Sequence, residues 1–357
     1  MLIILKAKKL RKINTHITTM TKMKKILVIS LLMLGFSSIG SAQQEPQFTQ
    51  HMLDKLAYNP GYAGSSGSMC AMLMYRNQWL GLKLDSPVAG IDAGSTPTNF
   101  MFSFDSPVKF LHGGIGLQFN ADAIGYHKNM SGAFAYAFRM YWGPGNLAAG
   151  VEANFNSITF NSDQLVGSDD LSGSILDNNT SSSDPALNTS ADADFLFDMS
   201  VGIFYQVPGT YYVGLSAKNL LASKSDNLNY QNVRSLYLMG GYDFVMPMNP
   251  SFKLKPSVLL KTANFSVFQA DVGCLLDYRN TFWGGLNYRV FDAISIIAGV
   301  NWQKLKFSVA YDFTTSKLGT FKPGRSMGSL EFYLQYCFKV IIPQKPPSIY
   351  RNTRYLL

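Results

Sequence analysis

Apolar and polar positions alternate in fourteen segments of roughly ten residues along most of the chain. The final segment is the clearest, because Leu330 and Phe332 share one face of an extended chain while Glu331 lies on the other. Alternation with a period of two is typical of β-strands whose two faces meet different surroundings. We therefore predict strands at 69–79, 98–104, 113–120, 130–141, 146–156, 195–206, 211–218, 234–245, 251–261, 267–277, 281–289, 293–301, 304–313 and 328–338.

Charged side chains within these segments fall on the face opposite the apolar one, except Arg234, which opens its segment and can reach the interface. The rule holds for Arg76, Arg139, Glu152, Asp198, Lys218, Asp243, Asp271, Asp277, Arg289, Asp312 and Glu331. A lysine or arginine that faces lipid at mid-membrane costs about 2–4 kcal/mol, so a membrane barrel requires this parity. A soluble β-sandwich also alternates, but its outer face would be richer in Lys and Glu. The pattern favours an all-β fold: a transmembrane antiparallel β-barrel of about 14 strands over residues 69–338.

The connections between the predicted strands differ in length in a regular way. With both chain ends in the periplasm, the short connections should be periplasmic and the long ones should face outward. The short group comprises 105–112, 142–145, 207–210, 246–250, 278–280 and 302–303, and the long group comprises 80–97, 157–194, 219–233 and 314–327. Long loops on a rigid scaffold often carry function, so we expect 157–194 and 314–327 to face partners.

The net charge of +9 belongs to the first part of the chain. Residues 1–42 hold eight Lys and Arg and no acid, so the remainder carries only +1 and a nucleic-acid partner is not expected. Residues 1–42 read as a leader with a signal peptide, because Lys24-Lys25 precedes an apolar run that ends before Gly40-Ser41-Ala42. The apolar run is too short for an anchoring helix. Residues 1–22 are unusual before a signal, which suggests a mis-annotated start.

Two segments flank the predicted barrel. Residues 43–68 carry several apolar and aromatic residues, which a disordered leader rarely has, so we predict an N-terminal plug or a periplasmic rim segment. A short helix is expected between Gln44 and Leu56. Residues 339–357 contain three prolines, which predicts a Pro-rich periplasmic tail.

Three cysteines remain after the leader, namely Cys70, Cys274 and Cys337. Closing the barrel pairs the first strand with the last, and parity puts Cys70 and Cys337 on the lumenal face near the periplasmic end. A disulfide between them requires Cα atoms closer than about 7 Å. One slip of register would prevent it, and the register is not readable from sequence. Cys274 should face lipid and stay unpaired.

The chain lacks the motifs of an enzyme. It contains no G-x-S-x-G, no H-E-x-x-H and no P-loop, and its cysteines match no zinc spacing. Acidic and basic residues on the lumenal face are better explained as structural ion pairs. We therefore expect no catalytic residue, no metal and no cofactor.

Several blocks resemble the PorP/SprF family of outer-membrane proteins of the type IX secretion system. The blocks are Pro46-Gln47-Phe48-Thr49-Gln50, Tyr58-Asn59-Pro60-Gly61-Tyr62-Ala63-Gly64, Arg76-Asn77-Gln78-Trp79, Asn120-Ala121-Asp122-Ala123-Ile124-Gly125, Asp198-Met199-Ser200-Val201-Gly202, Tyr311-Asp312-Phe313-Thr314-Thr315-Ser316-Lys317-Leu318 and Gly328-Ser329-Leu330-Glu331. The resemblance covers essentially the whole exported chain, and the N-terminal blocks are the specific part.

This resemblance implies a non-enzymatic role in exporting or anchoring large surface proteins, including gliding adhesins with a C-terminal sorting domain. Secretion-machine or periplasmic components are implied as further partners. The candidate partner-binding residues are Gln47, Phe48, Tyr58, Asn59, Pro60, Tyr62, Arg76, Asn77, Gln78 and Trp79. For Trp79, a place in the aromatic girdle at the outer interface is the alternative.

A solute channel or a fatty-acid-type transporter is the second hypothesis. Such a barrel can also have fourteen strands and an N-terminal plug, and its lumen is wide enough for a solute. The motif match favours the secretion component. Either reading places the protein in the outer membrane, in contact with its lipid.

Overall fold

The structure is a computed structural model that describes residues 46–81, 96–124, 127–160, 193–225, 230–316 and 326–338. The leader at 1–42 and the tail at 339–357 lie outside these residues. The same is true of most of the long loops 157–194 and 314–327.

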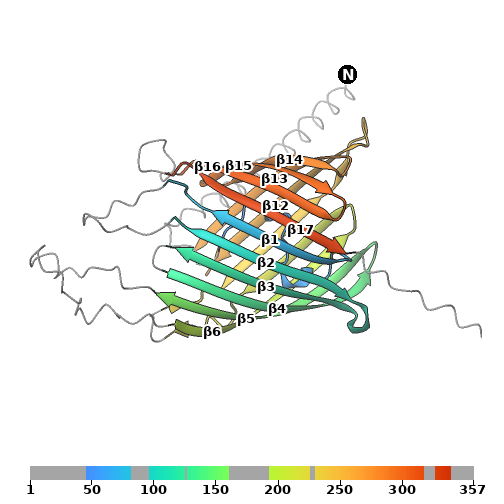
Figure 1. Ribbon diagram of the computed structural model, residues 1–357. Helices are drawn as coiled ribbons and strands as arrows, with labels where there is room; N and C mark the ends of the chain where they lie inside the picture. Colours follow the sequence, from blue (N-terminus) through green and yellow to red (C-terminus); the bar gives the residue numbers. More distant parts are fainter. Residues whose placement is uncertain are drawn as a thin grey trace, which may run out of the picture.

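Fourteen antiparallel strands close into a barrel (Figure 1). They are β1 (Met69–Asn77), β2 (Thr98–Val108), β3 (Gly113–Ile124), β4 (His127–Trp142), β5 (Gly145–Phe160), β6 (Ala193–Val207), β7 (Tyr211–Lys218), β10 (Ser235–Tyr242), β12 (Phe252–Ala263), β13 (Val267–Tyr278), β14 (Phe282–Arg289), β15 (Ala293–Trp302), β16 (Leu305–Thr314) and β17 (Ser329–Phe338). Each strand pairs with its neighbours in sequence, and β1 pairs with β17 to close the ring. The predicted fold is confirmed.

The alternation of apolar and polar residues along the strands arises because one face of each strand meets lipid and the other faces the lumen. Large apolar side chains point outward and are exposed on the barrel surface, as in the run Phe195, Phe197, Met199, Val201 and Ile203 of β6. The lumenal parity is confirmed for the charged residues that are buried inside, namely Arg76, Glu152, Asp198, Asp271, Asp277, Arg289, Asp312 and Glu331. The apolar surface is therefore on the outside of this molecule, as the hydrocarbon core of a bilayer requires.

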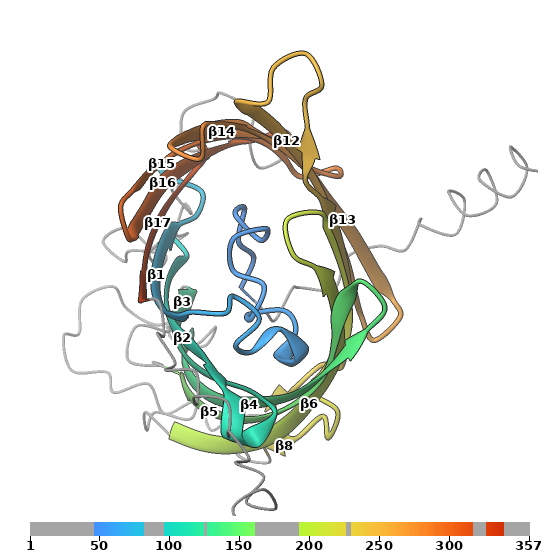
Figure 2. The same cartoon turned by 90° about the vertical axis from the view of Figure 1, so that its right-hand side faces the viewer.

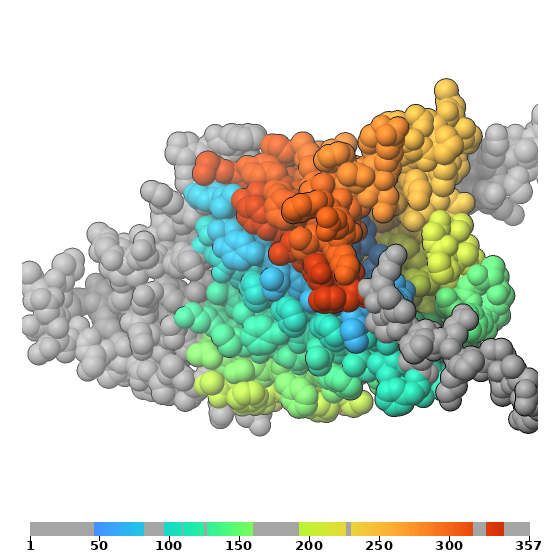
Figure 3. Space-filling model, turned by 45° about the vertical axis from the view of Figure 1, so that its right-hand side comes forward, coloured from blue at the N-terminus to red at the C-terminus, as the bar shows by residue number. Residues whose placement is uncertain are grey.

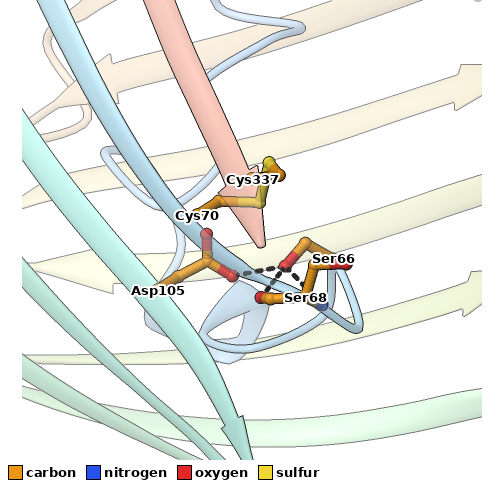
Figure 4. Close-up of a disulfide and its surroundings, with 5 residues drawn as sticks. All are labelled: Ser66, Ser68, Cys70, Asp105 and Cys337. Atoms are coloured by element: carbon orange, nitrogen blue, oxygen red, sulfur yellow. Dashed lines mark hydrogen bonds between the residues drawn. A yellow bond between two sulfur atoms is a disulfide. The ribbon is translucent and has the colours of Figure 1, made fainter. Parts of the chain in front are cut away.

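The seam between β1 and β17 places Cys70 directly opposite Cys337. Their Cα atoms are 4.1 Å apart and a disulfide joins them (Figure 4). Beside this bond, Asp105 accepts a hydrogen bond from Ser66 Oγ at 2.8 Å. Both cysteines lie at the end of the barrel where the short connections gather, which we call the short-turn mouth. Cys274 on β13 is free and partly buried.

Two details of the predicted strands are wrong. The region predicted as loop 219–233 contains a small hairpin, β8 (Lys224–Ser225) and β9 (Tyr230–Gln231). Asp198 organises this region, because its carboxylate accepts hydrogen bonds from Leu221 N at 2.9 Å and Asn232 Nδ2 at 3.2 Å.

The strand predicted at 234–245 is the second error. It stops at Tyr242, and β11 (Phe244–Val245) pairs only with β12. The amide of Asp243 donates to Thr210 O at 2.6 Å, which carries the pairing with the β7 side one residue beyond Tyr242.

Residues 46–68 lie inside the ring of strands (Figure 2). We call them the plug segment. Its only regular helix among the described residues is the short 3-10 turn η1 (Pro60–Tyr62). The short helix expected before Leu56 is wrong for residues 46–56, which form turns. The amides of Thr49 and Gln50 donate to the Glu331 carboxylate on the barrel wall, so they do not serve a helix ladder.

No helix in the described ranges is long and apolar enough to cross a membrane.

Candidate functional site

The plug segment and the barrel wall form one continuous buried core. Phe48 and Tyr58 pack with side chains that reach inward from opposite sides of the barrel. These wall residues are Met72, Met74, Met101, Phe204, Tyr237, Met239, Leu259 and Tyr333. The ring centroids of Tyr58 and Tyr237 are 5.5 Å apart. This apolar cluster, inside an otherwise polar lumen, holds the plug segment against the barrel wall.

One side of the lumen holds the plug segment through charge. Arg76 on β1 donates to Glu331 at 2.9 Å and to Asp312 at 2.7 Å. Thr49 is placed between them, and its hydroxyl donates to Asp312 at 2.7 Å and accepts from Arg76 Nη1 at 2.8 Å. Buried carboxylates need several donors, and the plug segment supplies some of them.

A second ion cluster continues the first along the same wall. Arg289 on β14 donates to Asp271 at 2.9 Å and lies 4.0 Å from Asp312. Lys261 on β12 approaches Asp271 at 3.6 Å. Three cations therefore face three buried carboxylates, so the lumen carries no large uncompensated charge here. We call Arg76, Asp271, Arg289, Asp312 and Glu331 the charged wall.

The opposite side of the lumen holds the plug segment by close approach. Asn59 caps η1, and its side-chain Nδ2 donates to Ile203 O at 3.0 Å. A Cβ at Gly202 would lie 2.1 Å from Asn59 Oδ1, and one at Gly150 would lie 2.4 Å from Gly61 N. A Cβ at Gly214 would also meet Asn59, at 2.7 Å. We call Gly150, Gly202 and Gly214 the glycine wall, because an added Cβ would meet the plug backbone at Gly150 and the Asn59 side chain at Gly202 and Gly214.

Cationic side chains on the wall also bind carbonyl groups of the plug segment. Arg139 on β4 donates to Ala63 O at 2.8 Å and to Gly64 O at 2.9 Å. Lys218 on β7 donates to Ala57 O at 3.0 Å. These bonds satisfy backbone groups of an irregular chain that lies away from bulk water.

Three titratable groups of the plug segment have shifted pKa values. Burial raises the pKa of Asp54 to about 7, although a hydrogen bond with the Ala57 backbone opposes the shift. Burial lowers the pKa of His51 to about 4, with Asp271 as the main opposing charge. Burial also lowers the pKa of Lys55 to about 8, against the attraction of Asp243 and Asp54. At pH 7 the plug segment thus carries a charged Lys55 and a neutral His51.

The structure places most of the predicted partner-binding residues inside the barrel. Gln47, Phe48, Tyr58, Asn59, Pro60 and Arg76 are buried. Tyr62 is half-buried and stacks edge-on against Phe204. These side chains make contacts within the chain, so a partner would meet the surface that they support and not the side chains themselves. Their role in partner binding stays a prediction.

Asn77, Gln78 and Trp79 form a small rim at the opposite end of the barrel, which we call the long-loop end. All three are half-buried. The Trp79 amide donates to Ser329 Oγ at 3.1 Å, and Asn77 Oδ1 accepts from Thr96 Oγ1 at 3.2 Å. The rim joins the start and end of the barrel where the long loops leave it.

Two pockets open on either side of the plug segment. The pocket toward the long-loop end is lined by amides and hydroxyls, including Gln118, Asn120, Asn129, Ser131, Asn154, Asn156, Asn219, Tyr230 and Asn232. The pocket toward the short-turn mouth has a volume of about 190 Å³ and contains Lys55, Lys255 and Lys306. We call it the lysine pocket. Sequence reasoning found neither, because each collects residues from strands far apart in the chain.

The described residues contain no cluster of three or more His, Cys, Asp or Glu side chains placed to hold a metal ion.

A closed barrel with an apolar outer face and an occupied polar lumen defines the class: this is an outer-membrane β-barrel protein. Within that class, the chain belongs to the family of type IX secretion system membrane proteins called PorP/SprF, whose model matches residues 40–336. The resemblance seen in the N-terminal blocks is confirmed. No curated protein matches the chain.

The chain is similar to several solved structures at low sequence identity. The toluene transporter TodX of Pseudomonas putida is 8% identical, with a TM-score of 0.46, and the match covers 86% of this chain and 97% of that one. Omp33 of Acinetobacter baumannii is 6% identical, with a TM-score of 0.41, and the match covers 76% and 99%. These similarities concern the fold alone.

Proposed function

We propose that this protein is a non-enzymatic outer-membrane component of the type IX secretion system that assists export or surface anchoring of large secreted proteins. Its cargo would be adhesins of the gliding-motility type, which carry a C-terminal sorting domain. Secretion-machine or periplasmic components would bind at the short-turn mouth. A signal peptide ending at Ala42 would direct the chain to the outer membrane.

The observation that carries the proposal is the way in which the plug segment fills the lumen. The charged wall binds Thr49 and Gln50, and the glycine wall receives Asn59 and Gly61. A segment held from both sides supports a rigid scaffold with two binding ends better than it supports an open pore. Family membership supplies the process in which such a scaffold would act.

The cargo-binding surface would lie at the long-loop end. It would comprise the loops 157–194 and 314–327 together with the rim at Asn77, Gln78 and Trp79. Most residues of those loops lie outside the described part of the chain. The rim is joined to Gly328, whose carbonyl accepts from Leu80 N at 2.7 Å.

Affinity capture from isolated outer membranes tests the proposal. The full-length protein, tagged at the C-terminus, should recover a secreted protein through its C-terminal domain. Two variants sharpen the result. Trp79→Ala should reduce recovery if the rim contacts cargo, whereas Trp79→Phe serves as the matched control that keeps an aromatic ring at the interface. Both variants should keep the heat-modifiable gel mobility of a closed barrel. If neither substitution changes the recovery of the secreted protein, the rim does not contact the cargo.

The solute channel and the fatty-acid-type transporter form the competing proposal. They require a continuous path past the plug segment, whereas the scaffold requires only that the segment stay docked. Capture that yields no secreted or machine protein, together with large steady conductance of the intact barrel, would favour the channel.

A further inference from the structure

The lysine pocket lies between the plug segment and the strands β7, β10, β12, β13, β14, β15 and β16 at the short-turn mouth. In the space-filling view the molecule is hollowed at this mouth, between the orange strands and the yellow strands, with blue atoms of the plug segment at depth (Figure 3). A ligand in the compartment that this mouth faces would reach the pocket without moving the plug segment.

Three ammonium groups share this pocket with two carboxylates, those of Asp243 and Asp277. Lys255 Nζ forms an ion pair with the Asp277 carboxylate at 2.6 Å. Lys306 Nζ lies 5.4 Å from the centre of the Trp283 ring, and no carboxylate of the described residues comes within 4.0 Å of it. Its charge is therefore balanced only at a distance.

Lys55 is the second ammonium without a close carboxylate among the described residues. Its Nζ donates to Met52 O at 2.8 Å and lies 4.7 Å from the centre of the Tyr212 ring. Cation–π contacts and a carbonyl stabilise an ammonium, but they do not neutralise it. Two partly buried cations beside each other favour an anion between them.

The rest of the pocket is apolar or aromatic. Trp283 and Leu275 are buried, and Tyr212 forms part of the lining. The volume of about 190 Å³ exceeds the roughly 150 Å³ of a cavity that accepts benzene. The pocket can thus take one small ring or a short aliphatic chain that carries a charged group.

We propose that the lysine pocket binds a carboxylate attached to a small apolar group, with Lys306 and Lys55 holding the carboxylate and Trp283 and Leu275 covering the apolar part. The carboxylate could belong to a small organic acid or to the end of a polypeptide, and the chemistry is the same for both. This pocket would work whether or not the barrel takes part in secretion, so its failure leaves the proposed function standing.

Ligand-observed fluorine NMR on the full-length protein in a nonionic detergent tests the proposal. The probes are 4-fluorobenzoate and its neutral analogue 4-fluorobenzamide, which match in shape and differ in charge. We expect the carboxylate to bind at least tenfold more tightly than the amide. Equal affinity of the two probes would overturn the proposal, because a pocket without charge recognition would not separate them.

Variants of two neighbouring lysines provide the matched comparison. Lys306→Gln should weaken 4-fluorobenzoate binding about tenfold and leave 4-fluorobenzamide unchanged. Lys304 lies two residues away on an exposed turn, so Lys304→Gln should change the affinity for neither probe. Lys55→Gln gives a second chance to detect the effect if Lys306→Gln fails to assemble, as judged by heat-modifiable mobility. Unchanged 4-fluorobenzoate affinity in correctly assembled Lys306→Gln would contradict the assignment.

Competition distinguishes the two sources of the carboxylate. An acetylated tripeptide ending in phenylalanine is offered as the free acid and as the C-terminal amide. Displacement of 4-fluorobenzoate by the free acid alone supports a polypeptide end as the ligand. Displacement by neither peptide, with benzoate binding intact, supports a small organic acid.

Discussion

The charged wall and the glycine wall hold the same plug segment by opposite means. On the charged wall, long side chains reach inward and bind Thr49 and Gln50 through buried ion pairs. On the glycine wall, the absence of side chains lets Asn59 and Gly61 approach the strands directly. The first region depends on charge compensation and the second on shape. A substitution should therefore harm each region for a different reason.

The largest expected effect is loss of Arg76. Arg76→Ala leaves Asp312 and Glu331 buried without their main cation, and removing one partner of a buried pair costs about 3–5 kcal/mol. Urea unfolding of the barrel in lipid vesicles should show this loss in the free energy of unfolding. Arg76→Lys keeps the charge but cannot donate to both carboxylates as a planar fork, so its loss should be smaller. Equal stability of wild type and Arg76→Ala would contradict the charge-based account.

A pH-dependent effect of Asp54 comes next. Its pKa is about 7 in the folded protein against an ordinary value of 3.8. The unfolded chain thus releases this proton first, and the contribution of Asp54 to wild-type stability falls as pH rises from about 4 to about 7. Asp54→Asn mimics the protonated acid and lacks this decline.

The variant should match wild type below pH 4 and exceed it above pH 7, by up to about 4 kcal/mol. His51 is common to both proteins and cancels in the difference. Unfolding curves collected at several pH values measure this difference. A difference that does not change with pH would show that Asp54 does not titrate as described.

A smaller effect is expected on the glycine wall. Gly150→Ala places a methyl group 2.4 Å from plug backbone atoms, and overpacking typically costs about 1–3 kcal/mol. Gly132→Ala on the adjacent strand β4 is the matched control, because nothing lies within 4 Å of its added Cβ. In unfolding experiments, Gly132→Ala should have the same free energy of unfolding as wild type. If both alanine variants lose the same stability, close approach is not the reason for glycine at 150.

Alternation along the strands could be predicted from sequence because lipid and lumen impose opposite polarity on successive residues. The contacts of the plug segment could not be predicted, because Gly150 and Gly202 look like weak strand positions until the plug segment is seen beside them. The lysine pocket was also hidden, since Lys55, Lys255 and Lys306 come from three distant parts of the chain. The seam register depends on the shear of the whole barrel, which no local pattern encodes.

The seam provides the smallest expected effect. β1 pairs with β17 from Met69 to Asn77, and Arg76 lies opposite Glu331 in the same ladder. Replacing Cys70 and Cys337 by serine should therefore leave the barrel assembled, with unchanged heat-modifiable mobility. Thiol labelling of the denatured, unreduced wild type should find one free thiol, at Cys274, and three free thiols would contradict the disulfide.

Docking of the plug segment from both walls is the central claim, and conductance in planar bilayers tests it most directly. Intact protein should give low conductance, because residues 46–64 fill the lumen. Deleting those residues should produce large and steady channels from a barrel that still shows heat-modifiable mobility. Large, steady conductance of the intact protein, equal to that of the deletion, would contradict the account.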